Sequence, residues 1–194
     1  MCHPAAPPRL LSARVHEAQG PGAVGFAAMQ AAGVAGRLVW LRPEVAAAGE
    51  VLPAGLARFL APERLVRVTA GSEAELLWAT EEVLRAGVAG LVVAEPQRPL
   101  GLTAGRRLQL AAEAGGSPGL LLIRDGAGSP AAETRWQVRA LAGDTPDSTR
   151  AEWALIRNKK GTLGAWTVEW DDATHSVTVV SAAGERLPAA ARAP

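Results

Sequence analysis

The sequence predicts an α/β fold, in which a mainly parallel β-sheet covered by helices is followed by antiparallel β-strands joined by hairpins. Two patterns carry this prediction. Up to about residue 128, short and almost purely apolar segments alternate with segments of helical periodicity, and parallel strands need such helical crossovers. From about residue 129 onward, apolar and polar residues alternate around tryptophans, which is typical of antiparallel strands.

The first part of the chain resolves into five strands and four helices. Its strands are short apolar runs, and its helices carry apolar residues three and four positions apart. One helix has Glu75 three residues after Ser72, which is the spacing of a capping box, and Gly87 ends it. In chain order we expect a strand over 14–17, a helix over 26–32, a strand over 38–41, a helix over 53–60, a strand over 65–68, the helix between Ser72 and Gly87, a strand over 91–94, a helix over 103–114 and a strand over 120–123.

The second part of the chain is expected to contain four antiparallel strands. Turn-forming pairs at Lys160-Gly161 and Asp171-Asp172 separate the last three of them and predict hairpins. A polar loop is expected over 142–150. The expected strands span 136–141, 153–157, 166–170 and 176–180.

These patterns predict one domain over 14–180, consisting of an α/β part over 14–128 and a β-rich end over 129–180. Residues 1–13 are expected to form a flexible N-terminus, and residues 181–194 a disordered tail. A length of 194 residues suits one such domain with a sizeable core and is too short for two.

Composition excludes several classes of function. The formal net charge is +1, so nothing in it attracts the whole chain to nucleic acid, and we expect any contact with DNA to be weak. No apolar run approaches the ~20 residues that span a bilayer, and the first residues lack a secretory signal pattern, so we expect no membrane association and a cytoplasmic location. The single cysteine, Cys2, beside His3, does not predict a metal site.

A glycine-rich turn between the first strand and the first helix has the spacing of a phosphate-binding loop. The working pattern is G-x-x-x-x-G-K-[ST], in which the lysine contacts the phosphates and the hydroxyl binds magnesium. Here Phe26 stands at the lysine position and Ala27 at the hydroxyl position, and neither side chain can do this chemistry. The segment therefore predicts a degenerate phosphate loop that keeps its shape. It consists of Gly20, Pro21, Gly22, Ala23, Val24, Gly25, Phe26 and Ala27.

Two interpretations of this segment remain open. In the first, it is only a tight turn between strand and helix, which needs its glycines for backbone conformation and close packing. In the second, its backbone N–H groups still bind an anion, or ATP with magnesium, weakly. Otherwise the sequence predicts no cofactor.

The order of several segments resembles the RecA superfamily and, more closely, the ImuA proteins. Gly20-Pro21 followed by Gly25 is similar to the opening of the RecA nucleotide loop with its lysine replaced. The helix and strand of 72–95 resemble those that lead to a Walker B carboxylate, with Glu95 in the place of the usual aspartate. The segments that resemble ImuA are 103–123, 134–136 and 166–171, and the whole resemblance covers about 14–180.

This resemblance implies a RecA-like core and a role in damage-induced (SOS) mutagenesis and translesion DNA synthesis. The partners it implies are an ImuB-like Y-family polymerase homologue, an error-prone C-family DNA polymerase and RecA itself. One departure matters. RecA recombinases carry a long mobile DNA-binding loop after the strand that corresponds to 120–123, whereas here only about a dozen residues, 124–135, precede the next strand. We therefore expect a non-catalytic adaptor that acts through protein contacts.

Three polar residues are candidates for the remnants of a nucleotide site. Glu95 ends an apolar strand, where open α/β sheets place functional groups, and it either holds magnesium through water or faces solvent before Pro96. Arg157 and Lys159 resemble a recombinase segment that reaches the nucleotide of a neighbouring subunit. They contact phosphate or a neighbouring subunit, or simply solvate the hairpin turn.

Trp153, Trp166 and Trp170 are candidates for a protein-binding face, because tryptophan is a frequent anchor of interfaces. The alternative is that they belong to the core, since Trp166, Val168 and Trp170 share one face of a strand with a period of two.

Two other functions remain open at this stage. The chain is an ATPase of the RecA superfamily in which other groups replace the missing lysine, or it is a relative of the SulA cell-division inhibitors, which share the fold in reduced form.

Overall fold

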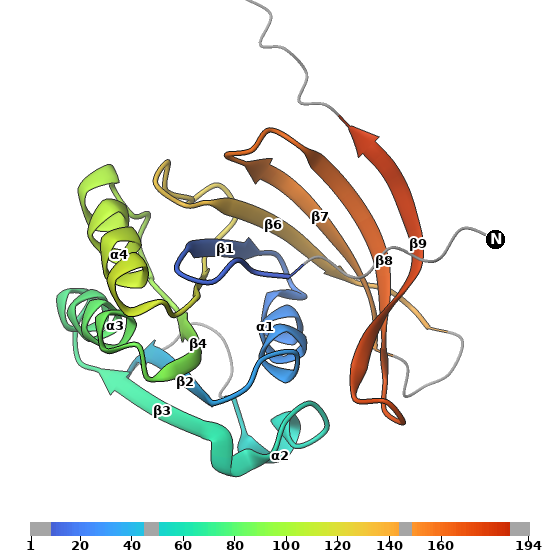
Figure 1. The fold of residues 1–194 in the computed structure, drawn as a ribbon, viewed down its shortest axis with the longest axis horizontal. Coiled ribbons are helices and arrows are strands. Elements are labelled where there is room, and N and C mark those ends of the chain that lie inside the picture. The colour runs from blue at the N-terminus through green and yellow to red at the C-terminus, as the bar shows by residue number, and fades with distance from the viewer. Residues whose placement is uncertain (1–8, 45–50, 144–148, 187–194) are drawn as a thin grey trace, which may run out of the picture.

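A single β-sheet runs through the whole of the described chain, which in this computed structural model comprises residues 9–44, 51–143 and 149–186 (Figure 1). Its nine strands lie in the order β3-β2-β4-β5-β1-β6-β7-β8-β9. The strands are β1 (Val15–Gln19), β2 (Arg37–Pro43), β3 (Leu65–Ala70), β4 (Ala89–Ala94), β5 (Gly119–Leu122), β6 (Thr134–Ala140), β7 (Arg150–Asn158), β8 (Leu163–Asp171) and β9 (Ser176–Arg186). The helices are α1 (Ala23–Ala32), α2 (Pro53–Leu56), the short 3-10 helix η1 (Pro62–Arg64), α3 (Glu73–Ala86) and α4 (Leu102–Gly115).

The sheet changes from parallel to antiparallel at β6. Strands β3, β2, β4, β5, β1 and β6 all pair in parallel, whereas β6, β7, β8 and β9 pair antiparallel. The predicted fold class, a mainly parallel α/β sheet followed by antiparallel strands, is therefore confirmed.

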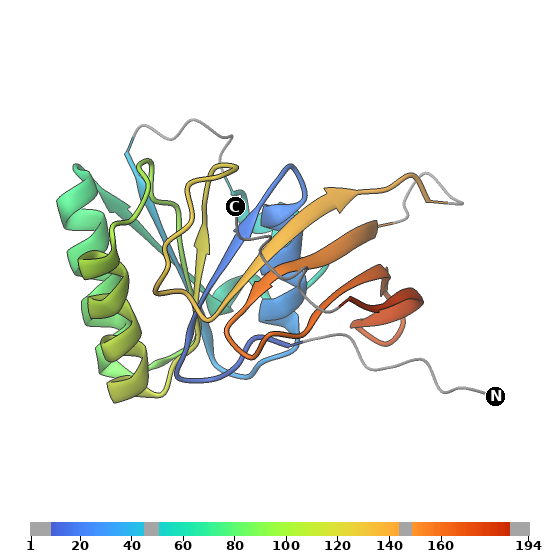
Figure 2. The same cartoon turned by 90° about the horizontal axis from the view of Figure 1, so that it is seen from above.

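Helices cover both faces of the parallel strands (Figures 1 and 2). Helices α3 and α4 lie side by side on one face, and α1 lies on the other, where β6–β9 curve around it. Two hydrophobic clusters result. One joins α1 to the β-rich end and includes Phe26 and Trp153, and the other joins α3 and α4 to the sheet through Leu76 and Leu108. Alternate residues of the buried strand β4 enter each cluster, as expected of a strand covered on both faces.

Helix α3 has the ends that its sequence predicts. The Ser72 side chain accepts a hydrogen bond from Glu75 N at 3.2 Å, and the Glu75 carboxylate accepts one from Gly71 N at 2.9 Å. Gly87 follows the helix with a φ of 68°, a left-handed conformation that favours glycine.

Two predicted helices have different bounds in the structure. Helix α1 begins at Ala23 and not at Phe26, because Phe26 N already donates to Gly22 O. The helix expected over 53–60 is restricted to α2, and hydrogen-bonded turns follow it, in which Phe59 N and Leu60 N both donate to Leu56 O. Glycine within this short helix lowers its intrinsic stability, which accounts for the early end.

The expectations for the two ends of the chain need correction where they fall on described residues. Residues 9–13 were expected to be flexible, but Leu10 N donates to Gln30 Oε1 at 3.4 Å and Ala13 N to Gly116 O at 3.2 Å. The disordered tail expected from residue 181 begins too early, because β9 pairs with β8 as far as Arg186. Residues 1–8 and 187–194, with Cys2 and His3, lie outside the described residues.

None of the helices in the described ranges has both the length and the apolar character needed to cross a membrane.

Candidate functional site

The turn that joins β1 to α1 is short and closed by its own hydrogen bonds. Gly20 has a φ of 92°, and its carbonyl accepts from Ala23 N at 3.1 Å. Gly22 N donates to Val138 O of the neighbouring strand β6 at 3.2 Å. A Cβ atom on Gly20 would lie 2.5 Å from Val138 O, so only glycine fits between the turn and β6.

This geometry corrects the prediction that the segment keeps the shape of a phosphate loop. In such a loop, backbone N–H groups face the anion before the helix begins. Here the helix has already begun at Ala23, Gly25 lies inside it, and the N–H groups of Gly22 and Ala23 bind carbonyls of the protein itself. Pro21 has no N–H group to offer. Gly20 to Ala23 therefore form a tight turn, as in the first interpretation, while the N–H groups of Val24 and Gly25 in the first turn of α1 have no acceptor among the described residues. Weak anion binding by these amides stays a prediction.

The residue at the lysine position belongs to the hydrophobic core. Phe26 is 1% exposed, and its ring packs edge-on against Trp153 with centroids 4.7 Å apart and against Trp136 at 5.5 Å. Ala27, at the hydroxyl position, is fully buried in the same cluster. Phe26 thus joins α1 to the antiparallel strands, and a cationic side chain at this position would be desolvated.

Glu95 is buried and bonded, which corrects the expectation that it faces solvent. It is 8% exposed, and its Oε1 accepts a hydrogen bond from the indole Nε1 of Trp40 at 2.6 Å. Its Oε2 lies 3.9 Å from the Arg42 guanidinium. Both partners come from β2, which is adjacent to β4 in the sheet. The carboxylate is therefore committed to the packing of β2 on β4, and strand β5 separates it from the turn after β1.

Arg157 and Lys159 bind backbone carbonyls of the segment that follows β5. The Arg157 guanidinium donates to Ala132 O and Pro130 O, both at 2.7 Å, and Lys159 Nζ donates to Ala131 O at 2.8 Å. The solvated turn therefore does not describe these side chains, whereas their contact with phosphate or with a neighbouring subunit stays a prediction. The two side chains clamp residues 130–132 to the start of the β7–β8 hairpin.

A buried ion pair that the sequence analysis missed holds the same segment from the other side. Glu17 of β1 is fully buried and accepts from Ser129 N at 2.7 Å and from Arg135 Nε at 2.8 Å. Arg135 also donates to Ser129 O at 3.2 Å. Glu17 and Arg135 are 118 residues apart in the sequence, so no local pattern could have paired them.

The tryptophans proposed as a protein-binding face lie mainly in the core. Trp153 is 1% exposed and Trp170 is 4% exposed, so the interface prediction is wrong for both. Trp166 is half-buried and packs on Trp136 with ring centroids 5.9 Å apart. Because side chains alternate along a strand, Trp166, Val168 and Trp170 all lie on the face of β8 that is turned to α1. This agrees with the alternative prediction that these tryptophans belong to the core.

The predicted site residues are thus not brought together into one centre. The turn and Glu95 lie at the same edge of the sheet, at the carboxyl ends of β1 and β4 with β5 between these strands, whereas Arg157 and Lys159 lie at the end of the antiparallel strand β7, at the opposite edge. Within the described part of the chain, no three His, Cys, Asp or Glu side chains are grouped so that they could hold a metal ion.

Sequence comparison finds relatives among the ImuA proteins, although no family model matches the chain. Protein ImuA from two strains of Caulobacter vibrioides is 34% identical over 158 residues, which cover 72% of this chain and 63% of the relative. The chain therefore spans less than two thirds of the length of these relatives.

Structure comparison places the fold beside the RadB recombinase, with a TM-score of 0.64 over 89% of this chain and 93% of RadB. At 13% sequence identity this likeness concerns the fold alone. SulA from Pseudomonas aeruginosa matches 57% of this chain and 97% of its own with a TM-score of 0.47 and 22% identity, a likeness too low to carry an argument. The predicted resemblance is confirmed: the chain is similar in sequence to Protein ImuA, and its fold is like that of the RadB recombinase.

Proposed function

We propose that this chain is a non-catalytic RecA-like adaptor of ImuA type, which acts in the cytoplasm in damage-induced mutagenesis and translesion DNA synthesis. Its partners in this role are an ImuB-like Y-family polymerase homologue, an error-prone C-family DNA polymerase and RecA. Homology to Protein ImuA over most of the chain supports the assignment to this system.

The burial of Phe26 is the observation that carries the non-catalytic part of the proposal. A working site needs a lysine here to reach the phosphates, and the position is filled by a ring packed between Trp136 and Trp153. The nearby N–H groups of Gly22 and Ala23 are also bonded within the protein. The lysine charge is thus missing and two of the loop amides are occupied, which disfavours the alternative of a residual ATPase.

The clamped segment after β5 supports an adaptor over a recombinase. Side chains of Glu17, Arg135, Arg157 and Lys159 all bind backbone groups between Ser129 and Ala132. A loop that reorganises around DNA needs free backbone, and here it is held by charge-assisted hydrogen bonds. We therefore expect this chain to bind DNA weakly, if it contacts DNA, and to act mainly through protein contacts.

Two measurements test the two parts of the proposal separately. Isothermal titration of the purified chain with magnesium-ATP is expected to give no saturable heat, and binding in the micromolar range would contradict the non-catalytic part. Size-exclusion chromatography with the ImuB-like homologue from the same organism is expected to give a complex. If no complex forms, and deletion of the gene leaves damage-induced mutation frequency unchanged, the adaptor role is wrong.

A further inference from the structure

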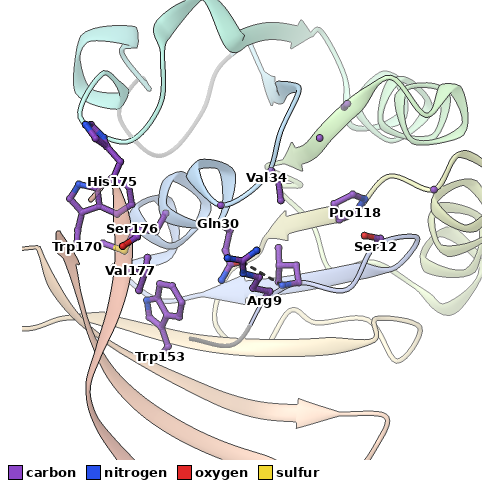
Figure 3. A pocket seen from close by; sticks show the side chains of 16 residues that line it. Arg9, Ser12, Gln30, Val34, Pro118, Trp153, Trp170, His175, Ser176 and Val177 are labelled. Carbon is purple, nitrogen blue, oxygen red and sulfur yellow. Dashed lines mark hydrogen bonds between the residues drawn. The ribbon is translucent and has the colours of Figure 1, made fainter. Parts of the chain in front are cut away.

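A pocket of about 520 Å³ lies at the end of the sheet opposite the β1–α1 turn (Figure 3). Residues at the start of β4 and just before β5, such as Ala89 and Pro118, form one wall, and the last turn of α1 forms another. The third wall comes from the β-rich end, through Trp170 and Val177. Pockets of this size in proteins hold small organic ligands.

The lining combines an apolar body with hydrogen-bond donors and has no acidic side chain. None of the residues that line the pocket is aspartate or glutamate. Ser12, His175 and Ser176 contribute polar groups at its rim, and Arg9 contributes a formal positive charge. The larger apolar side chains in the lining are Leu10, Met29, Val34, Pro118, Trp153, Trp170 and Val177.

The Arg9 side chain lies over the pocket beside Gln30 (Figure 3) and has no hydrogen-bond or ion-pair partner among the residues that the structure describes. Its charge is not needed to neutralise the carboxyl end of α1. Arg64 already donates to Ala31 O at 3.2 Å and, just beyond the helix, to Val34 O at 2.5 Å, and the carbonyl of Gln30 accepts from Gly33 N. Arg9 is thus a cation with no counter-charge among the residues that the structure describes, next to a cavity lined in part by tryptophans.

We propose that this pocket binds an amphipathic organic anion. An aromatic or branched apolar group of the ligand packs between Trp170, Val177 and Pro118, and its carboxylate or sulfonate pairs with the Arg9 guanidinium. The lining holds no carboxylate, which disfavours cations. The nearby Asp172, which accepts a hydrogen bond from Trp170 Nε1 at 2.8 Å, is paired with the Arg58 guanidinium. This inference does not depend on the proposed adaptor role, and it concerns the opposite end of the sheet from the turn discussed there.

The experiment uses anilinonaphthalene sulfonate, a fluorescent aromatic anion, titrated into the purified full-length chain. We expect saturable binding, a loss of affinity of about tenfold in Arg9→Gln, and no loss in Arg106→Gln, because Arg106 is an exposed arginine of α4 that does not line the pocket. Ser176→Trp, which fills the rim, is expected to abolish binding. Ser181→Trp is its control, because Ser181 is also exposed on β9 but does not line the pocket.

Competition distinguishes a free small acid from the carboxylate terminus of a protein segment. Hydrocinnamate represents the first source, and N-acetylglycyl-phenylalanine represents the second. Displacement of the dye by either acid, together with failure of the carboxamide of the same dipeptide, supports an anion site and identifies the preferred source.

Three results would overturn the inference. One is the absence of saturable binding up to about 1 mM dye, because a specific pocket of this size should bind the dye with a lower dissociation constant than that. Another is equal affinity in Arg9→Gln and Arg106→Gln. The third is equal displacement by the carboxamide and the acid, which would mean that the charge is not recognised. Urea unfolding of each variant shows that the changes in affinity are not losses of folding.

Discussion

Placing a lysine at position 26 is the sharpest test of the view that the glycine turn serves the core. Phe26 is 1% exposed and contacts two tryptophan rings, and truncation of such a buried aromatic side chain costs about 3–5 kcal/mol. Lysine also brings an ammonium group that must be desolvated or lose its proton. We therefore expect Phe26→Lys to lower the free energy of unfolding by at least about 3 kcal/mol, a large part of the stability of a typical domain.

Urea unfolding followed by tryptophan fluorescence measures this loss directly, because Trp136 and Trp153 surround the substituted position. Val24→Lys is the matched control. Val24 lies in the same turn of α1 but is 40% exposed, so we expect a change of about 0.5 kcal/mol or less. The reasoning is refuted if Phe26→Lys unfolds at the same urea concentration as the wild type. It is equally refuted if Phe26→Lys combined with Ala27→Ser binds magnesium-ATP in the micromolar range.

Three further changes probe the contacts that hold the fold. Glu17→Ala leaves Arg135 without its buried partner and should lower the free energy of unfolding in urea by about 3–5 kcal/mol. The control Glu82→Ala breaks an exposed ion pair and should lower it by less than about 1 kcal/mol. Equal losses in the two variants would contradict this account. Burial lowers the pKa of His16 from 6.5 to about 4, so protonation favours the unfolded chain, and about 3 kcal/mol of stability should be lost as the pH falls from 6.5 to 4. His16→Gln should flatten that part of the stability–pH curve, and an unchanged slope would assign it to other groups. Arg64→Ala removes three hydrogen bonds to carbonyls at the end of α1 and should lower stability by about 2 kcal/mol, while Arg64→Lys should recover only part of it, as thermal unfolding can measure.

Most elements of the fold could be predicted from sequence because their signals are local. The capping pair of Ser72 and Glu75 and the left-handed Gly87 fix the ends of α3 wherever the helix lies. The β7–β8 hairpin likewise depends only on the turn at Gly161, which has a φ of 86°. The helix start at Ala23 was missed because the glycine spacing was compared with a phosphate loop, and the contact with Val138 that closes the turn comes from a distant strand.

The site could be predicted less well, because its residues are defined by partners far away in the chain. In the sequence Glu95 is only a carboxylate at the end of a strand. Its partner Trp40 lies 55 residues earlier and comes beside it only because β2 and β4 are adjacent in the sheet. In the sequence Arg157 belongs to a polar hairpin turn. Its hydrogen-bond acceptors, the carbonyl groups of Pro130 and Ala132, come from a segment more than twenty residues earlier that only the fold brings close. The sequence shows which side chains have groups that can bind a ligand, but only the fold shows which of these groups already bind other parts of the protein.

The central position of β1 has a consequence for how the chain acquires its structure. This strand precedes the other strands of the sheet in the sequence, yet it pairs with β5 and β6, whose residues follow it by roughly a hundred positions. During synthesis, β1 therefore lacks one neighbour until β5 is made and the other until β6 is made, and the ring of Phe26 lacks its aromatic contacts until Trp136 and Trp153 are made. We therefore expect the pairing of β1 with β5 and β6 to form late in folding, and the apolar segment from β1 through α1 to be the part that a chaperone for unfolded chains binds.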